Sequence, residues 1–314
     1  MVYPFVAVFM VTFNHEKYVG QAIDSVLMQK TRFPVKLFIG EDCSTDQTAS
    51  ICLKYQEENP DIIEVVINKE NTGALKNAKQ IYEACFASGA KYIAMLEGDD
   101  YWTDPFKLQK QVDFLELNSD YVVSCHDAAV IGSNGELITK SKLPGFCKQD
   151  FSGKELIKGA LILTLSICFR NVIKEIPAEY GKVFNGDTFL TSMLGVFGRS
   201  KYQDEIEPAV YRLHTGGIWS SKSDSERKEE QQRTYYYLFR FHRRIKSDKN
   251  VVKILFEKYY NLKYDSFFQL IKDKKTFNSV TIFPSLLFDC IKYGYLGYLI
   301  KSFKKSYRAF SASL

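Results

Sequence analysis

The sequence predicts an α/β fold in which a mostly parallel sheet is flanked by helices and followed by a helical C-terminal extension. Apolar runs of strand length alternate with segments of helical periodicity over the first 131 residues, which is the pattern of successive βαβ units. The first run, residues 2–11, is continuously apolar, as expected for a strand buried on both faces. After residue 223 the alternation stops and long helical patterns follow.

Strands and helices are expected in strict alternation up to residue 131. The expected strands cover residues 2–11, 35–39, 62–67, 92–96 and 121–131. The expected helices cover residues 16–29, 46–58, 74–87 and 105–117, the first with Asn14 as its N-cap. Further along, we expect helices at 152–158 and 186–197, a strand at 161–169, and a hairpin-like stretch through Tyr202 and Val210.

The chain has 314 residues, enough for one large domain and an appendage. We place the α/β domain at residues 1–222 and a basic, aromatic-rich helical region at residues 223–314. From Ser225 to the end there are 19 Lys and Arg against 8 Asp and Glu, so the remainder of the chain is net acidic. A basic C-terminal region attached to an acidic domain predicts that the C-terminal region binds an anionic partner. The alternative is that its lysine-rich helix faces are simply exposed to solvent.

Seven cysteines are scattered along the chain without a CxxC pair, which disfavours a disulfide framework and a cysteine zinc site. Free thiols fit a reducing compartment. The N-terminus lacks the charged start and cleavage site of a signal peptide, and no stretch of about 18 apolar residues is free of charge. We therefore expect a cytoplasmic location, with peripheral contact on the inner face of the plasma membrane.

Polar and acidic residues follow three of the expected strands: Thr12–His15, Glu41–Asp46 and Glu97–Asp100. Ligands of open parallel sheets bind at the carboxyl ends of the strands, so these segments should share one site. Several carboxylates there would repel a diphosphate unless a cation intervened. Since Mg²⁺ and Mn²⁺ bind carboxylate oxygens and bridge to phosphates, the sequence predicts a metal–diphosphate site.

Within this site, glycine between Glu97 and Asp99 is expected to allow a tight turn, so that both carboxylates reach one ligand. The alternative is an acidic turn with a helix-capping Asp. For Asp42 we predict ligand binding through a nucleobase N–H or a ribose hydroxyl. Asp46 is expected to have a structural role, as the N-cap of the next helix.

Four short segments also occur in a characteristic order and spacing: VAVFMVTFN (Val6–Asn14), AIDSVLMQ (Ala22–Gln29), EDCSTDQT (Glu41–Thr48) and LEGDDYW (Leu96–Trp102). Together they resemble the family-2 glycosyltransferases with the GT-A fold, over residues 1 to about 220. The resemblance implies an inverting, metal-dependent transfer of a sugar from a nucleotide-diphosphate donor, most often a UDP-sugar. The implied acceptor is a hydroxyl of a glycan or lipid-linked saccharide in bacterial cell-surface polysaccharide synthesis.

The resemblance also implies roles for single residues. Asp42 resembles the family's nucleobase-binding Asp. Glu97, Gly98 and Asp99 stand at the DxD motif, with Asp99 as direct ligand of Mn²⁺ or Mg²⁺ and Glu97 at the ribose or a metal-bound water. Asp187, in the sequence NGDTF, resembles the catalytic base that deprotonates the acceptor, with a helix N-cap as the alternative.

The segment YRLHTGGIWS, from Tyr211, resembles one that closes over the donor diphosphate in this family. There, His214 is expected to bind the metal or a phosphate, and Arg212 to pair with phosphate. Donor-binding roles are also expected for a further set of residues: Thr12, Asn14, Glu16 and Trp219.

Three positions, Glu41, Cys43 and Glu97, depart from the usual family pattern and leave the donor identity open. Two functions other than sugar transfer are less well supported by the sequence. A catalytically inactive nucleotide-sugar-binding scaffold is disfavoured by the joint presence of Asp42, Asp99 and Asp187. A sugar nucleotidyltransferase is disfavoured because such enzymes usually carry a Gly-rich basic loop near the N-terminus, which this chain lacks.

The C-terminal region mixes aromatic and cationic side chains, as in Tyr235–Arg244 and again in Tyr293–Phe310. Basic amphipathic helices of this kind bind anionic lipid interfaces, which would suit a lipid-linked acceptor. Ordinary helix packing and an oligomer interface are the alternatives. No nucleic acid partner is expected, since no recognised motif accompanies the charge.

Overall fold

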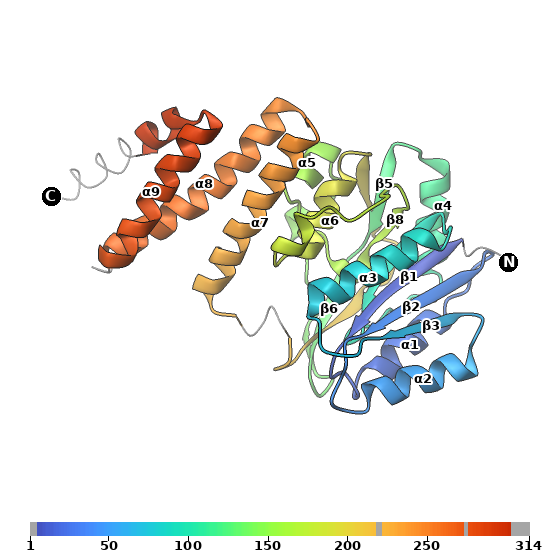
Figure 1. The fold of residues 1–314 in the computed structure, drawn as a ribbon. Helices are drawn as coiled ribbons and strands as arrows, with labels where there is room; N and C mark the ends of the chain where they lie inside the picture. The colour runs from blue at the N-terminus through green and yellow to red at the C-terminus, as the bar shows by residue number, and fades with distance from the viewer. Residues whose placement is uncertain (1–4, 218–221, 273–275, 303–314) are drawn as a thin grey trace. The chain divides into compact units, whose positions relative to one another are not determined.

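The computed structural model describes residues 5–217, 222–272 and 276–302. The chain divides into two compact units, Met1–Ser223 and Asp224–Leu314. The first unit contains a seven-stranded sheet of order β3-β2-β1-β4-β8-β5-β9 and a three-stranded sheet of order β10-β6-β7. The second unit is helical (Figure 1).

The strands of the large sheet are β1 (Val6–Thr12), β2 (Val35–Glu41), β3 (Ile63–Ile67), β4 (Tyr92–Glu97), β5 (Tyr121–Cys125), β8 (Cys168–Arg170) and β9 (Arg199–Tyr202). The first four pair in parallel, β9 pairs in parallel with β5, and β8 is antiparallel to both of its neighbours. The small sheet contains β6 (Ala128–Gly132), β7 (Leu137–Thr139) and β10 (Ala209–Leu213). The predicted mostly parallel sheet flanked by helices is therefore confirmed.

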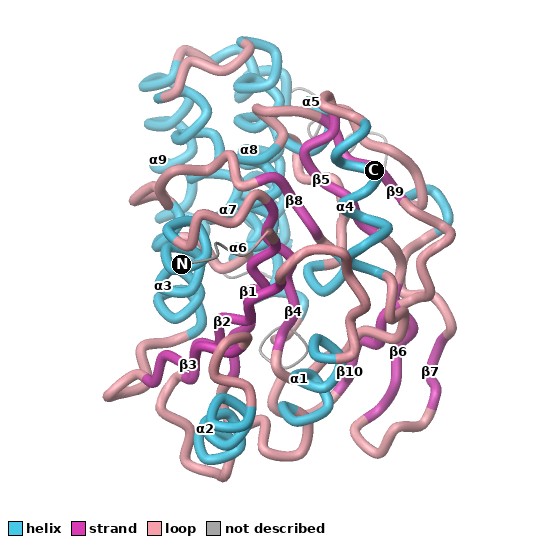
Figure 2. The backbone as a smooth tube through the Cα atoms, turned by 90° about the vertical axis from the view of Figure 1, so that its right-hand side faces the viewer, coloured by secondary structure: helices cyan, strands magenta, loops and turns pink. Residues whose placement is uncertain are grey.

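Helices α1 (Val19–Leu27) and α2 (Thr48–Glu58) lie on one side of β1–β3, and α3 (Ala74–Ala87) lies on the other (Figure 2). The reason is topological. The chain steps outward from β1 to β3 and then returns across the sheet to β4, and right-handed crossovers put the returning helix on the opposite face. The strand order thus reverses between β1 and β4, which is where doubly wound sheets form ligand crevices.

The remaining helices of the first unit are α4 (Lys107–Leu117), α5 (Gly153–Ile157) and α6 (Gly186–Leu194), with short 3₁₀ turns at Gly145–Cys147, Thr164–Ser166 and Tyr180–Lys182. The helical unit contains α7 (Asp224–Arg244), α8 (Lys249–Lys272) and α9 (Thr276–Tyr293). Within that unit a buried ion pair joins α8 to α9, with Lys263 Nζ 2.9 Å from Asp289 Oδ2. Among the described residues, no helix is both long and apolar enough to cross a membrane.

Four expectations about local structure were wrong. The strand expected at 121–131 is two strands, because the Asp127 carboxylate accepts the amides of Ala128 and Leu143 and turns the chain into the small sheet. No hairpin joins β9 and β10, which pair with β5 and β6 respectively. Of the strand expected at 161–169, residues 164–166 form a 3₁₀ turn. Asn14 is not a helix N-cap, since α1 begins after Tyr18.

Candidate active site

The site lies where three chain segments end side by side. Val11 of β1 is in register with Glu97 of β4, and the Gly98 amide donates to the Val11 carbonyl at 3.0 Å. The residues that follow β1 and β4 are therefore neighbours. The third segment is β10, which is tied to the same place by two hydrogen bonds between the backbones of Val210 and Tyr101.

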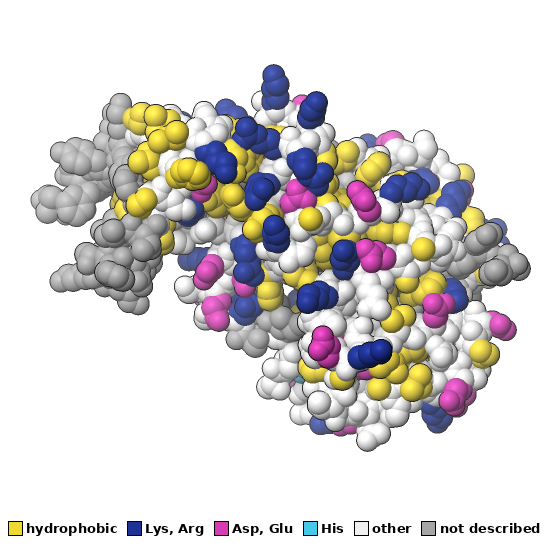
Figure 3. Space-filling model, viewed as in Figure 1, with side chains coloured by type: hydrophobic (Ala, Val, Ile, Leu, Met, Phe, Trp, Pro, Cys, Tyr) yellow, Lys and Arg dark blue, Asp and Glu magenta, His cyan; other side chains and the backbone are white. Residues whose placement is uncertain are grey.

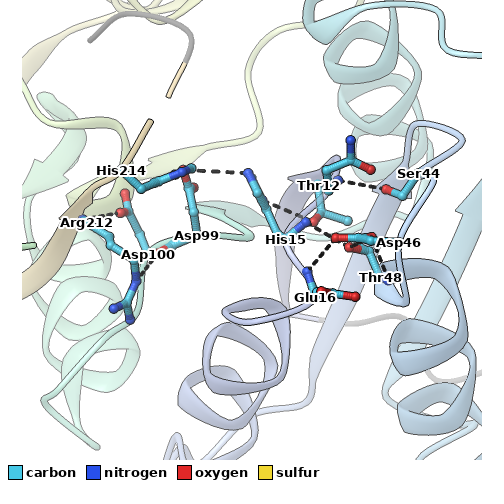
Figure 4. Close-up of polar contacts among 11 residues, drawn as sticks. Thr12, His15, Glu16, Ser44, Asp46, Thr48, Asp99, Asp100, Arg212 and His214 are labelled. Atoms are coloured by element: carbon cyan, nitrogen blue, oxygen red, sulfur yellow. Dashed lines mark hydrogen bonds and ion pairs between the residues drawn. The ribbon is translucent and has the colours of Figure 1, made fainter. Parts of the chain in front are cut away.

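This arrangement brings two imidazoles to one carboxylate (Figure 4). His214, just after β10, places Nε2 2.9 Å from Asp99 Oδ2, and His15, after β1, places Nε2 3.8 Å from the same oxygen. Burial opposes ionisation of Asp99, but the two histidines outweigh it and lower the pKa of the carboxyl. Burial also lowers the pKa of His15, with Asp99 only partly offsetting it. The histidines thus favour the ionised form of the Asp99 carboxyl.

Gly98 is needed for space rather than for a special backbone conformation. A Cβ atom at this position would lie 2.6 Å from Thr12 Oγ1 and 3.2 Å from His15 Nδ1, and the residue is not among those with positive φ. The tight turn expected from the sequence is present, with the Asp100 amide donating to the Glu97 carbonyl at 3.2 Å, but its backbone conformation does not require glycine. Its missing side chain lets β1 and the His15 ring approach the acidic loop.

A group of carboxylates surrounds Asp99. Burial, with Asp99 and Asp187 nearby, raises the pKa of Glu97 to about 8, and burial with the neighbouring acids raises the pKa of Asp100 well above its usual range. The positive charge of Lys142 opposes the negative charges of Asp100 and Glu97. Its Nζ lies 3.5 Å from the centroid of the Tyr211 ring. Negative charge in this low-dielectric site is therefore under-compensated. An excess of carboxylates next to two imidazoles is a donor set that fits a divalent cation.

Asp187 lies in the first turn of α6, where its Oδ1 accepts the Thr188 amide at 2.7 Å. Asn185 is the N-cap residue of this helix, so the alternative N-cap role for Asp187 is wrong. Burial raises the pKa of Asp187 above its ordinary value of 3.8. A carboxylate with a raised pKa and proximity to Glu97 is suited to accept a proton.

Arg212 holds the acidic loop in place. Its backbone amide donates to Asp100 Oδ1 at 2.8 Å, and its guanidinium donates to the Asp99 carbonyl at 3.1 Å and to Gln21 at 2.7 Å. The guanidinium also lies 4.6 Å from the Tyr18 ring centroid. The phosphate contact expected for Arg212 stays a prediction, since its contacts here are with the loop of Asp99 and with Gln21 and Tyr18.

Asp42 is saturated with hydrogen bonds inside the protein. Its Oδ1 accepts from Asn68 and from both the amide and the hydroxyl of Thr72 at 2.8–2.9 Å, and its Oδ2 accepts the Gly73 amide at 2.8 Å. Burial opposes ionisation, yet these donors outweigh it and lower the pKa of Asp42. A carboxylate has about four acceptor positions, so nucleobase binding stays a prediction that requires one partner to be exchanged.

The loop after β1 is fixed to the loop after β2. The Asn14 amide donates to Ser44 Oγ at 2.9 Å, and Glu16 Oε2 accepts the Gln47 amide at 3.0 Å. Asp46 accepts the amides of Glu16 and Thr48, a structural role as expected, although the N-cap residue of α2 is Gln47. Donor contacts of Asn14 and Glu16 stay predictions.

Trp219 lies outside the described residues. Two residues of the site had no assigned role in the sequence interpretation. His15 belongs to the polar segment after β1, so its position at a strand end was a usable signal. Lys142 follows β7, which pairs with β6, and β6 in turn pairs with β10. Its position near the acidic residues depends on these non-local pairings, and no local sequence pattern reveals that position.

The sheet order and the acidic loop at the carboxyl end of β4 match the GT-A fold that the sequence predicts. The model of glycosyl transferase family 2 matches residues 7–176, so the chain belongs to that family. This membership favours the predicted sugar transfer over the sugar nucleotidyltransferase alternative.

Relatives and solved structures agree with this assignment. Rv1520 of Mycobacterium tuberculosis is 34% identical over 221 residues, which is 69% of this chain and 61% of Rv1520. The chain thus matches about three fifths of that relative's length. A Bacillus subtilis protein named as a teichuronic acid biosynthesis glycosyltransferase, TuaG, is 36% identical over 112 residues, covering 36% of this chain and 42% of TuaG.

Two solved structures share the fold. S. aureus TarS 1–349 in complex with UDP-GlcNAc superposes with a TM-score of 0.55 at 16% identity, covering 92% of both chains. The mannosyltransferase PcManGT from Pyrobaculum calidifontis, in complex with GDP-Man and Mn²⁺, gives a TM-score of 0.57 at 13% identity, covering 98% of this chain and 83% of PcManGT. At these identities the likeness concerns the fold alone.

The hydrogen bonds of Asp42 generate a pH-dependent stability prediction. Because its pKa is lowered in the folded state, ionised Asp42 stabilises the fold above the ordinary value of 3.8 and this stabilisation is lost as the pH falls through the lowered value. Asp42→Asn should therefore unfold at lower denaturant than wild type at pH 7, with the difference shrinking below about pH 4. Urea titrations at several pH values measure this, and the exposed Asp61→Asn variant is the control. A difference that is independent of pH would contradict the assignment.

Proposed function

We propose that this chain is an inverting, metal-dependent glycosyltransferase that moves a sugar from a nucleotide-diphosphate donor, a UDP-sugar, to an acceptor hydroxyl. The observation that carries the proposal is the meeting of Asp99 and His214 at the carboxyl ends of β1 and β4, beside an anionic group that includes Asp187. A nucleotide diphosphate and a divalent cation are the ligands that such an edge suits.

Asp99 and His214 would hold the cation, Mn²⁺ or Mg²⁺. When bound, the cation supplies positive charge that stabilises the diphosphate as it leaves. Arg212 keeps the backbone of Asp99 in position through the 3.1 Å hydrogen bond from its guanidinium. Glu97, whose pKa is raised, would then contact the donor ribose as a hydrogen-bond partner.

Asp187 would act as the general base. It takes the proton of the acceptor hydroxyl while that oxygen forms a bond to the anomeric carbon and the bond from this carbon to the diphosphate oxygen breaks. Attack from the face opposite the leaving group inverts the anomeric centre. Burial favours this role because it raises the pKa of the carboxylate and so its affinity for the proton.

The donor and the acceptor are supported by likeness only. Among proteins of the same fold, TarS is described with UDP-GlcNAc and PcManGT with GDP-Man, which supports a nucleotide-diphosphate sugar as donor. The name of TuaG supports an acceptor in cell-surface polysaccharide synthesis, namely a glycan or a lipid-linked saccharide.

The base assignment predicts a selective kinetic defect. Asp187→Asn keeps the shape of the side chain and removes the proton acceptor, so turnover should fall about 10²–10⁴-fold. Binding of the donor nucleotide should stay within about twofold of wild type, since Asp187 contacts the acceptor. Transfer from a radiolabelled donor and calorimetric binding of the nucleotide give the two numbers. Asp61→Asn is the matched control, and an active Asp187→Asn variant would remove Asp187 from the mechanism.

A membrane contact is proposed for the helical unit. Hydrophobic side chains lie beside Lys and Arg on its surface (Figure 3). On α9 and the following turns the exposed residues include both kinds: Phe288, Ile291, Lys292, Leu296, Ile300 and Lys301. Apolar side chains flanked by lysines match the charge and polarity of an anionic lipid surface, where a lipid-linked acceptor would be found.

This contact predicts lipid-dependent flotation. The full chain should float with vesicles that contain anionic phosphatidylglycerol and much less with vesicles of phosphatidylcholine alone. The double variant Phe288→Ser/Ile291→Ser should lose most of this flotation, because both replaced side chains are 61% exposed and apolar. Leu117→Ser, which alters an 85% exposed leucine of the first unit, should behave as wild type. Equal flotation of all three proteins would refute the membrane contact.

A further inference from the structure

We propose that His15 is a third protein ligand of the metal site, beside Asp99 and His214. The resulting set of two imidazoles and one carboxylate selects a transition metal ion over Mg²⁺. This inference rests on the proposed function and adds to it. Mg²⁺ prefers oxygen ligands, whereas imidazole nitrogen is a good ligand for first-row transition metal ions. A site built from Asp99 and His214 alone would contain one imidazole and have a weaker preference.

The positions of the three candidate ligand atoms carry the proposal. One nitrogen of each histidine and one oxygen of Asp99 all lie within 4.8 Å of one another. The separations from Asp99 Oδ2 are 2.9 Å for His214 Nε2 and 3.8 Å for His15 Nε2. Two adjacent ligands at about 2.1 Å from one octahedral ion are about 3 Å apart, so small shifts suffice to bring all three to one ion.

The orientation of the His15 ring supports the same role. Its Nδ1 lies 3.2 Å from Thr12 Oγ1, within hydrogen-bond distance, so the hydroxyl can hold the ring with Nε2 toward Asp99. Metal-binding histidines commonly use the second ring nitrogen in this way, which fixes the ring and the tautomer. At 3.8 Å, Nε2 is too far from Asp99 for a hydrogen bond, so no hydrogen bond to Asp99 sets the direction of the ring.

The His15 ring lies close to the backbone of the acidic loop. The missing Cβ of Gly98 admits the His15 imidazole, since an added methyl group would lie 3.2 Å from its Nδ1. The rings of His15 and His214 meet edge to face, with centroids 5.7 Å apart. The two imidazoles therefore approach Asp99 from different directions, as ligands around one ion do. They come from segments 199 residues apart in the chain, so an ion would join the ends of β1, β4 and β10.

The test measures metal binding by the full chain without any sugar donor. Electron paramagnetic resonance gives the dissociation constant for Mn²⁺, and electron spin-echo modulation detects coordinated imidazole nitrogen. His15→Gln should weaken Mn²⁺ binding at least about tenfold and reduce the nitrogen modulation without abolishing it. Competition with Mg²⁺ should show that the preference for Mn²⁺ falls by a similar factor. Lys17→Gln, an exposed change on the same loop, is the control and should leave all three readouts unaltered.

A second variant addresses folding. Thr12→Val keeps the shape of the side chain and removes the hydroxyl that orients His15, so it should weaken Mn²⁺ binding by a smaller factor with both nitrogen couplings retained. Thermal melting checks that each variant is folded. The inference is overturned if folded His15→Gln binds Mn²⁺ with wild-type affinity and nitrogen modulation, or if wild type binds no Mn²⁺. Normal metal binding without sugar transfer would instead count against the proposed function and leave the ligand assignment standing.

Discussion

The site depends on the contact between Asp99 and His214, because it joins segments that only the folded chain brings together. Asp99 follows β4 at the point where the strand order reverses, and His214 follows β10. Hydrogen bonds between Val210 and Tyr101 fix β10 beside the acidic loop, and Arg212 adds contacts to both Asp99 and Asp100. The fold thus positions the two candidate metal ligands through backbone pairing rather than through a local motif.

The carboxyl groups around this contact have pKa values that are shifted in opposite directions. The pKa of Asp99 is lowered by its histidines, while burial and neighbouring acids raise the pKa of Glu97, Asp100 and Asp187. One carboxylate is therefore kept ionised among others that are costly to ionise. Groups with pKa values moved in opposite directions are characteristic of sites that bind cations or move protons. In the proposed mechanism, a cation at Asp99 and a base at Asp187 would use the two kinds of carboxylate for different tasks.

Much of the first unit could be predicted from the sequence because its strands are buried on both faces and its helices are amphipathic. α3 begins and ends where the pattern indicated, and β1–β4 were all expected. The prediction failed where non-local contacts decide, as at Asp127, whose carboxylate divides the segment expected to be one strand. The sequence placed Thr12–His15 and Glu97–Asp100 at one edge of the sheet, but it could not show that the His15 and His214 rings meet at Asp99. The saturated hydrogen bonds of Asp42 were equally invisible, since their donors lie 26–31 residues away.

The central claim, a nucleotide-sugar site organised by a metal at Asp99, is tested most directly by donor binding. A panel of UDP-, GDP- and dTDP-sugars would be titrated calorimetrically against wild type and Asp99→Ala, with and without Mn²⁺. The account predicts that a UDP-sugar binds wild type tightly only with Mn²⁺, and that Asp99→Ala loses this metal-dependent gain. Equal binding with and without Mn²⁺, or full metal dependence in folded Asp99→Ala, would contradict it.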